Sequence, residues 1–154
     1  MNRSAGEAGF TLIEIVAVLA ITAMLAGLAL PRWPHGTTRP ELEAYAMRIA
    51  ALLKADRNAA LARRERVATR LDVSAREVES GAGAGLVRLP EDVAFDALVA
   101  QTCAGGENGS AIAFLPSGMS CGGSIALARP GAAYHVRVNW LTGGVEIVAA
   151  EPSR

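Results

Sequence analysis

The chain has 154 residues with 15 basic and 15 acidic side chains, so its formal net charge is zero. This balance argues against a strongly basic nucleic-acid binder, and an aromatic content of only 5% argues against a base-stacking platform. Two cysteines exclude a disulfide-dense mini-protein and a four-cysteine zinc site. Hydrophobic residues nevertheless reach 51%, and one N-terminal segment holds the excess.

That segment runs from Phe10 to Leu30, and 17 of its 21 residues are apolar. A helix of this length spans about 30 Å, which is the thickness of the hydrocarbon core of a bilayer. Pro31 follows at once, where a helix ends or kinks. We therefore expect a transmembrane helix over residues 10–30, preceded by a polar leader over residues 1–9.

Three interpretations of this helix compete. A cleaved secretory signal would be shorter and would end at small residues, unlike the segment Leu28 to Pro31. A plain anchor leaves Glu14 unexplained, because a carboxylate inside a membrane helix costs about 2.5–3.5 kcal/mol. The third interpretation is cleavage between Gly9 and Phe10. Phe10 would then carry a free α-amino group, which Glu14 of a neighbouring helix could pair with in an assembly.

The residues Gly9 to Glu14 (GFTLIE) and the apolar helix that follows resemble the class III signal of type IV pilins and type II secretion pseudopilins. This resemblance implies that a membrane-embedded prepilin peptidase cuts after Gly9 and methylates Phe10. It also implies that Glu14 helps to recruit and register the subunit in a filament, and that Pro31 kinks the helix. The leader would be cytoplasmic, for which Arg3 gives slight support through the positive-inside rule.

Residues 31–40 contain three prolines and Gly36, so we expect a helix break or a linker there. A second helix is predicted to start near Glu41, because apolar residues then recur at helical spacing. These residues are Leu42, Tyr45, Ala46, Ile49, Leu52, Leu53, Ala59 and Ala60.

The later part of this helix and the residues just after it are basic. We interpret this part as a solvated face with Asp56 and Glu65 interspersed, and we keep an acidic partner, lipid headgroups and DNA as alternatives. The basic residues are Lys54, Arg57, Arg63, Arg64 and Arg66.

From Val67 onward the apolar period becomes two, which is typical of strands. Residues 80–85 and 105–110 are expected to be loops, and Thr142 to Gly144 is expected to be the turn of a hairpin. The sequence thus predicts an α+β fold, in which the second helix packs on an antiparallel β-sheet domain spanning residues 41–154. The strand candidates are residues 67–73, 86–89, 93–95, 112–115, 125–128, 134–140 and 145–147.

Residues 112–123 (IAFLPSGMSCGG) and 138–147 (VNWLTGGVEI) resemble the C-terminal domain of GspH-type pseudopilins. The chain departs from that pattern at Ser117 and Gly144, where aspartate and arginine are common. The resemblance implies a minor pseudopilin near the tip of a periplasmic filament of the type II secretion system. It would be a single-pass inner-membrane protein and a structural subunit, so it would be the substrate of an enzyme and not an enzyme itself.

The implied partners are the prepilin peptidase, the major pseudopilin, the other minor pseudopilins and inner-membrane lipid, and nucleic acid is not expected. The alternative is a minor pilin of a type IV pilus, which serves adhesion, motility or DNA uptake.

Residues 118–122 fit the G-x-S-x-G motif of α/β-hydrolases, but no acidic residue lies between Ser120 and His135 and a strand is predicted to follow. We therefore expect a glycine-rich turn. Cys103 and Cys121 flank the strand 112–115, and a disulfide is expected outside the cytoplasm, with two buried thiols as the alternative. The two histidines, His35 and His135, do not suggest a zinc site. We expect no metal and no cofactor.

Overall fold

The computed structural model describes residues 11–29, 36–104 and 106–150. The chain divides into two compact units, Met1–Pro34 and His35–Arg154. The expected leader over residues 1–9, the expected cleavage site at Gly9 and Phe10, and the expected helix break at Pro31 all lie outside the described residues.

In the first unit, helix α1 spans Leu12–Ala29. Its first turn closes when the amides of Glu14 and Ile15 donate to the Thr11 carbonyl at 3.0 and 3.3 Å. The Thr22 hydroxyl donates to the Val18 carbonyl at 2.6 Å, so this polar group is satisfied within the helix. We expected a transmembrane helix over residues 10–30. Across the part of the chain that the structure describes, no helix is both long enough and apolar enough to cross a membrane.

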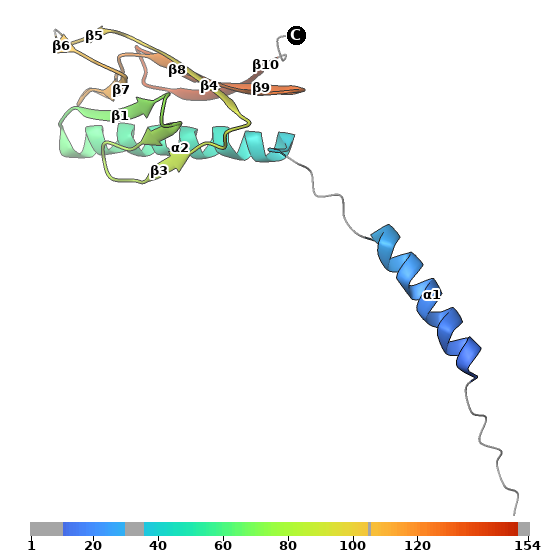
Figure 1. The fold of residues 1–154 in the computed structure, drawn as a ribbon. Coiled ribbons are helices and arrows are strands. Elements are labelled where there is room, and N and C mark those ends of the chain that lie inside the picture. Colours follow the sequence, from blue (N-terminus) through green and yellow to red (C-terminus); the bar gives the residue numbers. More distant parts are fainter. Residues whose placement is uncertain (1–10, 30–35, 105, 151–154) are drawn as a thin grey trace, which may run out of the picture. The chain divides into compact units, whose positions relative to one another are not determined.

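The second unit begins with helix α2, Arg39–Arg63, which runs along one side of the strands (Figure 1). We expected this helix to start near Glu41, after a linker over residues 31–40, and it starts two residues earlier, at Arg39. Thr38 is the N-cap: its hydroxyl accepts from the Glu41 amide, and the Glu41 carboxylate accepts from the Thr38 amide at 2.6 Å. Pro40 therefore lies in the first turn, where a missing amide hydrogen removes no helix hydrogen bond.

One face of α2 is buried, and it matches the apolar spacing seen in the sequence. Tyr45 and Ala59 from the expected set are partly buried at the margins of this face. The helix ends at Arg64, which caps it in the left-handed conformation with a φ of 54°. The buried residues are Leu42, Ala46, Ile49, Ala50, Leu52, Leu53, Asp56 and Ala60.

The expected antiparallel β-sheet domain consists of two four-stranded sheets and one two-stranded sheet. The first sheet has the order β3-β2-β1-β7, and the second has the order β10-β9-β8-β4. The first sheet comprises β1 Val67–Asp72, β2 Glu77–Glu79, β3 Leu86–Arg88 and β7 Ala111–Phe114. The second comprises β4 Ala94–Val99, β8 Gly123–Arg129, β9 Ala132–Val138 and β10 Val145–Ala150.

The expected hairpin is confirmed, since β9 pairs with β10 in the register Val138↔Val145. Strand β2 was missed, because its one apolar residue, Val78, lies between two glutamates and gives no repeating apolar pattern. The expected loop over residues 105–110 contains part of a short strand pair, β5 Thr102–Cys103 and β6 Gly106–Glu107. Trp140 was placed in the strand that became β9, but that strand ends at Val138 and Trp140 is 62% exposed.

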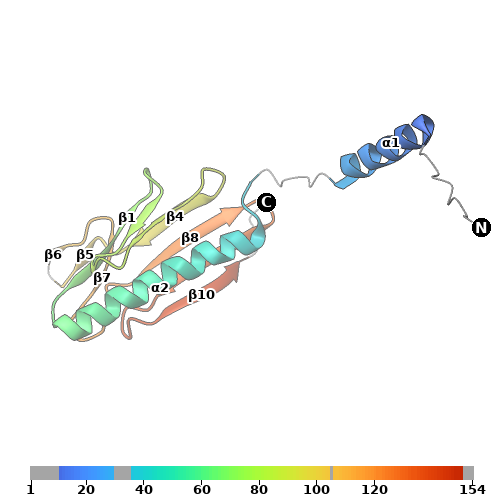
Figure 2. The same cartoon turned by 90° about the horizontal axis from the view of Figure 1, so that it is seen from below.

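Helix α2 contacts strands of both sheets. In Figure 1 the strands β8, β9 and β10 lie above α2 and β3 is drawn across its lower side, and in Figure 2 α2 lies in front of the strands, between β8 and β10. The core of the second unit lies between the helix and the strands. Its largest fully buried apolar side chains are Phe114, Leu42, Ile49, Leu53, Ile112, Ile125, Leu127, Val78, Val93 and Val136.

Candidate functional site

Glu14 lies in the first turn of α1, at the positive end of the helix dipole. The side chains around it are apolar and exposed, with Leu12 and Ile13 at 83% and 77%. A large exposed apolar surface is typical of an interaction site. Glu14 is thus a carboxylate in a surface that is suited to burial. Gly9, Phe10 and Pro31, the other residues predicted for this site, lie outside the described residues.

Asp56 is the central polar residue of the second unit, and it is fully buried. Its carboxylate accepts hydrogen bonds from the Thr69 hydroxyl at 2.6 Å, from the Ser80 hydroxyl, and from the amides of Gly81 and Ala82 at 3.0 and 3.1 Å. Buried charges are tolerated when such donors replace water. The network therefore holds both β1 and the loop after β2 against α2.

Our interpretation of Asp56 as part of a solvated face was wrong. Its position follows Leu52 and Leu53 at helical spacing and precedes Ala60 by four residues, so spacing alone places it on the buried face. The charged side chain concealed this signal. Gly81 shows how closely the loop approaches, because a Cβ at that position would overlap the carbonyl oxygen of Ala68.

Three arginines of the basic segment are used inside the domain. Arg57 donates to the carbonyls of Gly118 and Thr142 at 3.2 and 3.0 Å, and thus joins two turns to α2. Arg63 donates to the Ala82 carbonyl at 3.3 Å, and Arg66 donates to the side chain of Asn108 at 2.8 Å. The basic segment is therefore not only a solvated face, because three of its arginines also donate hydrogen bonds within the domain.

Cys103 and Cys121 are joined by a disulfide, with their Cα atoms 5.6 Å apart. The bond ties β5 to the segment after β7. Buried Asn108 secures the same loop, because its amide nitrogen donates to the carbonyls of Ala100 and Ala111 at 3.0 and 2.6 Å. The segment between β4 and β7 is therefore held at several points.

Ser120, the residue of the G-x-S-x-G motif, is buried in a turn between strands. Its hydroxyl donates to the Ala113 carbonyl at 3.0 Å and accepts from the Gly122 amide at 3.1 Å. Both bonds are structural, which fits the expected glycine-rich turn. Among residues 11–29, 36–104 and 106–150, no cluster of three or more His, Cys, Asp or Glu side chains is arranged to hold a metal ion.

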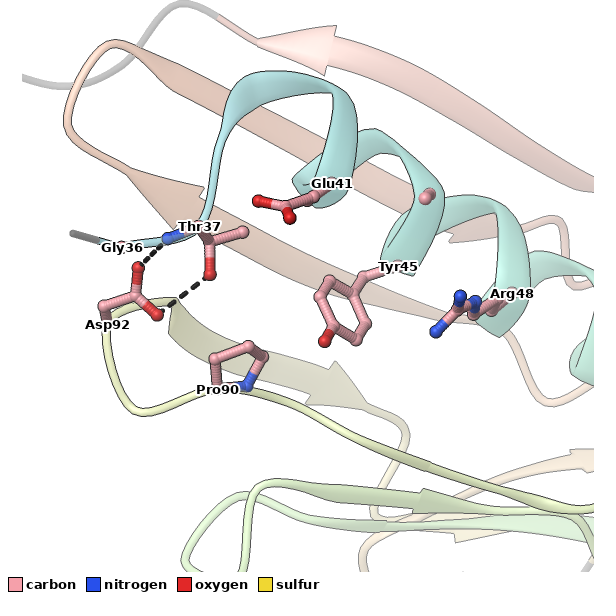
Figure 3. A pocket seen from close by; sticks show the side chains of 8 residues that line it. Gly36, Thr37, Glu41, Tyr45, Arg48, Pro90 and Asp92 are labelled. Carbon is pink, nitrogen blue, oxygen red and sulfur yellow. Dashed lines mark hydrogen bonds between the residues drawn. The ribbon is translucent and has the colours of Figure 1, made fainter. Parts of the chain in front are cut away.

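A hollow of about 440 Å³ lies beside the N-terminal end of α2 (Figure 3). Two carboxylates line it, and both accept hydrogen bonds from neighbouring threonines. Asp92 accepts from the amide and the hydroxyl of Thr37, and these bonds hold the pKa of the Asp92 carboxyl below its usual range. Glu41 accepts from the Thr38 amide and hydroxyl, which lowers the pKa of the Glu41 carboxyl in the same way. Sequence patterns gave no sign of the Thr37–Asp92 contact.

The rest of the hollow is a helix face and a proline. The ring of Tyr45 faces the hollow, with Pro90 across from it (Figure 3). The guanidinium of Arg48 lies 5.5 Å from the centre of the Tyr45 ring, within the range of a cation–π interaction. Since the carboxylates are already bonded to the protein, the hollow offers no free acidic group to a cation.

The comparisons with known proteins agree with this division of the chain. A family model described as the prokaryotic N-terminal methylation motif matches residues 4–30. The structure has a pilin-like fold, so the chain joins a prepilin-type N-terminal motif to a pilin-like domain. This domain is the second unit, His35–Arg154, and is called the head below. The comparison with curated protein sequences found no match.

Solved structures of two kinds resemble the chain. The minor pseudopilin EpsH from the type II secretion system of Vibrio cholerae is 16% identical, with a TM-score of 0.58 over 75% of this chain and 99% of that one. A second structure of EpsH, also 16% identical, gives a TM-score of 0.56 over 71% and 97%. The type IV minor pilin FimU of Pseudomonas aeruginosa is 14% identical, with a TM-score of 0.54 over 74% and 96%.

Proposed function

We propose that this chain is a minor pseudopilin of the type II secretion system, a structural subunit near the tip of the periplasmic pseudopilus. The observation that carries the proposal is the order of two features in one chain. A methylation motif over residues 4–30 is followed by a head with the pilin-like fold. In this proposal the function is mechanical: the growing filament helps to move folded proteins through the outer membrane.

In this proposal, residues 10–30 insert into the inner membrane and the head lies in the periplasm. The prepilin peptidase cuts between Gly9 and Phe10 and methylates the new amino group. In the filament, Glu14 of one subunit pairs with the Phe10 amine of the next. The physical reason is that a carboxylate surrounded by apolar side chains needs a cationic partner once lipid or helices exclude water.

Further partners follow from the same proposal. The subunit packs against the major pseudopilin and the other minor pseudopilins through its apolar helix. DNA is not a proposed partner, because Arg57, Arg63 and Arg66 already donate to groups within the domain. Fewer free cations are then left to neutralise phosphates.

The alternative is a minor pilin of a type IV pilus, which the likeness to FimU favours. The fold similarity is nearly equal for the two classes. We favour the pseudopilin because residues 112–123 and 138–147 resemble the GspH group. These segments include the turns that Arg57 holds, at Gly118 and Thr142.

A deletion strain tests this choice, scored in parallel for exoprotein secretion and for pilus-dependent motility, adhesion and DNA uptake. Loss of secretion with normal pili, restored by the intact gene, is the expected result. Normal secretion with defective pili would transfer the protein to the minor pilins. Normal results in both assays would contradict both functions.

Intact-mass measurement of the membrane form tests the processing separately. We expect the mass of residues 10–154 with one added methyl group, and a chain that still begins at Met1 would contradict cleavage. Glu14→Ala should be cut normally but should assemble poorly, as measured by cross-linking to the major pseudopilin. Glu14→Asp is the matched control, since it keeps the charge, and it should retain part of the assembly.

A further inference from the structure

The head is fastened at the point where the chain enters it. Thr37 precedes the N-cap of α2, and its amide and hydroxyl both donate to the carboxylate of Asp92, with the hydroxyl at 2.9 Å. Asp92 lies in the loop between β3 and β4, 55 residues further along the chain. Thr37 is buried to 8% exposure, whereas Asp92 is exposed, so the contact lies at the surface of the domain with its donor side covered (Figure 3).

Gly36 allows the chain to pass this carboxylate. Its φ is +118°, and a Cβ there would lie 3.0 Å from Oδ2 of Asp92. A side chain would therefore meet both a strained backbone and the carboxylate. The sequence at this position is thus fitted to the contact, and this argues against an incidental approach of two loops.

The loop that carries Asp92 is itself anchored. Arg76 donates to the Pro90 carbonyl through Nε and Nη2 at 3.1 and 2.7 Å, and it also donates to the Val93 carbonyl. Leu89 and Val93, on either side, are buried in the core. A force applied to Thr37 is therefore passed through Asp92 to residues that are part of the core.

The capping box at Thr38 and Glu41 cannot serve the same purpose. It joins residues three apart at the start of α2, so it moves with the helix. The first amides of a helix lack partners within it, and helix ends open locally at little cost in free energy. A load that enters at residue 36 reaches Thr37 first, before buried Leu42 and the 3.2 Å hydrogen bond from Tyr134 to Glu43 that also hold the start of α2 to the domain.

We propose that the Thr37–Asp92 contact is a mechanical clasp, which passes load from the N-terminal segment into the β3–β4 loop and keeps α2 from peeling away from the sheets. The load comes from the proposed filament function, so this part rests on that function. Asp92 acts here as a positioning residue. The hollow beside it is not proposed as a ligand site, because both of its carboxylates are already bonded to the protein.

Hydrogen exchange with mass spectrometry on the full chain in detergent micelles tests the clasp. Thr37→Val should make the amides of residues 41–45 exchange about fivefold faster, which corresponds to the loss of one ordinary hydrogen bond. Asp92→Ala removes the acceptor of both bonds, so it should accelerate the same amides by at least as much. Residues 49–60 should be unchanged. The double variant should exchange no faster than the faster single variant, because both changes break the same contact.

Two control variants separate the clasp from general effects. Glu91→Gln removes an exposed neighbouring carboxylate, and Thr37→Ser keeps the hydroxyl, so both should exchange like the unaltered chain. Exchange in Asp92→Ala equal to that in Glu91→Gln would overturn the clasp. So would acceleration throughout α2 and both sheets, or additive effects in the double variant.

A secretion assay on the same variants tests whether the Thr37–Asp92 contact has to bear load during secretion. Faster exchange together with impaired secretion in Asp92→Ala, at normal protein abundance, is the expected result. Faster exchange with normal secretion would overturn the mechanical role. Normal secretion in the full deletion strain would instead contradict the proposed function, while the exchange data would still measure the contact itself.

Discussion

The hydroxyl of Thr69 in β1 donates a 2.6 Å hydrogen bond to the carboxylate of Asp56 in α2, and both residues are fully buried. The bond joins the helix to the first sheet, whose strand β1 follows α2 in the chain. Ser80, Gly81 and Ala82 supply the remaining donors from the loop after β2. One carboxylate therefore organises three segments of the second unit.

Asp56→Ala should lower the free energy of unfolding by about 3–5 kcal/mol, because it leaves several buried donors without an acceptor. Asp56→Asn should cost less, since its carbonyl oxygen still accepts. Urea unfolding followed by circular dichroism measures both. Asn58→Ala, at an exposed position two residues further along α2, is the control. It should change the free energy of unfolding by no more than about 0.5 kcal/mol. A loss for Asp56→Ala no larger than the control would contradict the network.

Arg57→Ala should destabilise the domain by about 1–2 kcal/mol, since the guanidinium joins the Gly118 and Thr142 carbonyls to α2. Arg57→Lys should recover only part of the lost stability, because one ammonium group does not reproduce the two separate N–H donors that reach the two carbonyls. Lys54→Ala, an exposed charge on the same helix, is the matched control. Equal unfolding midpoints for Arg57→Ala and Lys54→Ala would show that the two turns do not depend on this contact.

Reduction of the Cys103–Cys121 disulfide should lower the free energy of unfolding by about 3 kcal/mol, from the loop-closure entropy of the 18-residue separation. The unfolding midpoint with and without reductant measures the effect. A chain carrying both Cys103→Ser and Cys121→Ser should not respond to reductant. If the unaltered chain also fails to respond, the disulfide is absent from the protein in solution.

The Asp92 clasp should depend on pH, because the two hydrogen bonds from Thr37 lower the pKa of the Asp92 carboxyl in the folded protein. Its stabilisation is then complete above the unfolded pKa of about 3.9 and is lost as the pH falls through the lower folded value. The difference in stability between the unaltered chain and Asp92→Asn should therefore shrink below about pH 4. Glu91→Gln serves as the reference, and a difference that stays constant from neutral to acidic pH would contradict an ionised clasp.

Much of the fold could be predicted from local patterns. The 3.6-residue period gave the buried face of α2, and alternation gave β1 and the β9–β10 hairpin, because these signals depend on residues close together in the chain. Helix ends were harder to place. Pro40 suggested a break, whereas the capping box at Thr38 and Glu41 starts the helix before it.

The sequence by itself determined the N-terminal motif, the apolar character of α1 and the order of two helices followed by strands. These features depend on composition and short spacing, and a family model matches the first of them. Only the tertiary structure decided that the strands divide into two sheets, that Asp56 is buried, and that Asp92 holds Thr37. Each of these depends on groups from distant parts of the chain that come together only in the folded domain. For Asp56 they meet away from water, where a carboxylate is tolerated only if specific donors surround it.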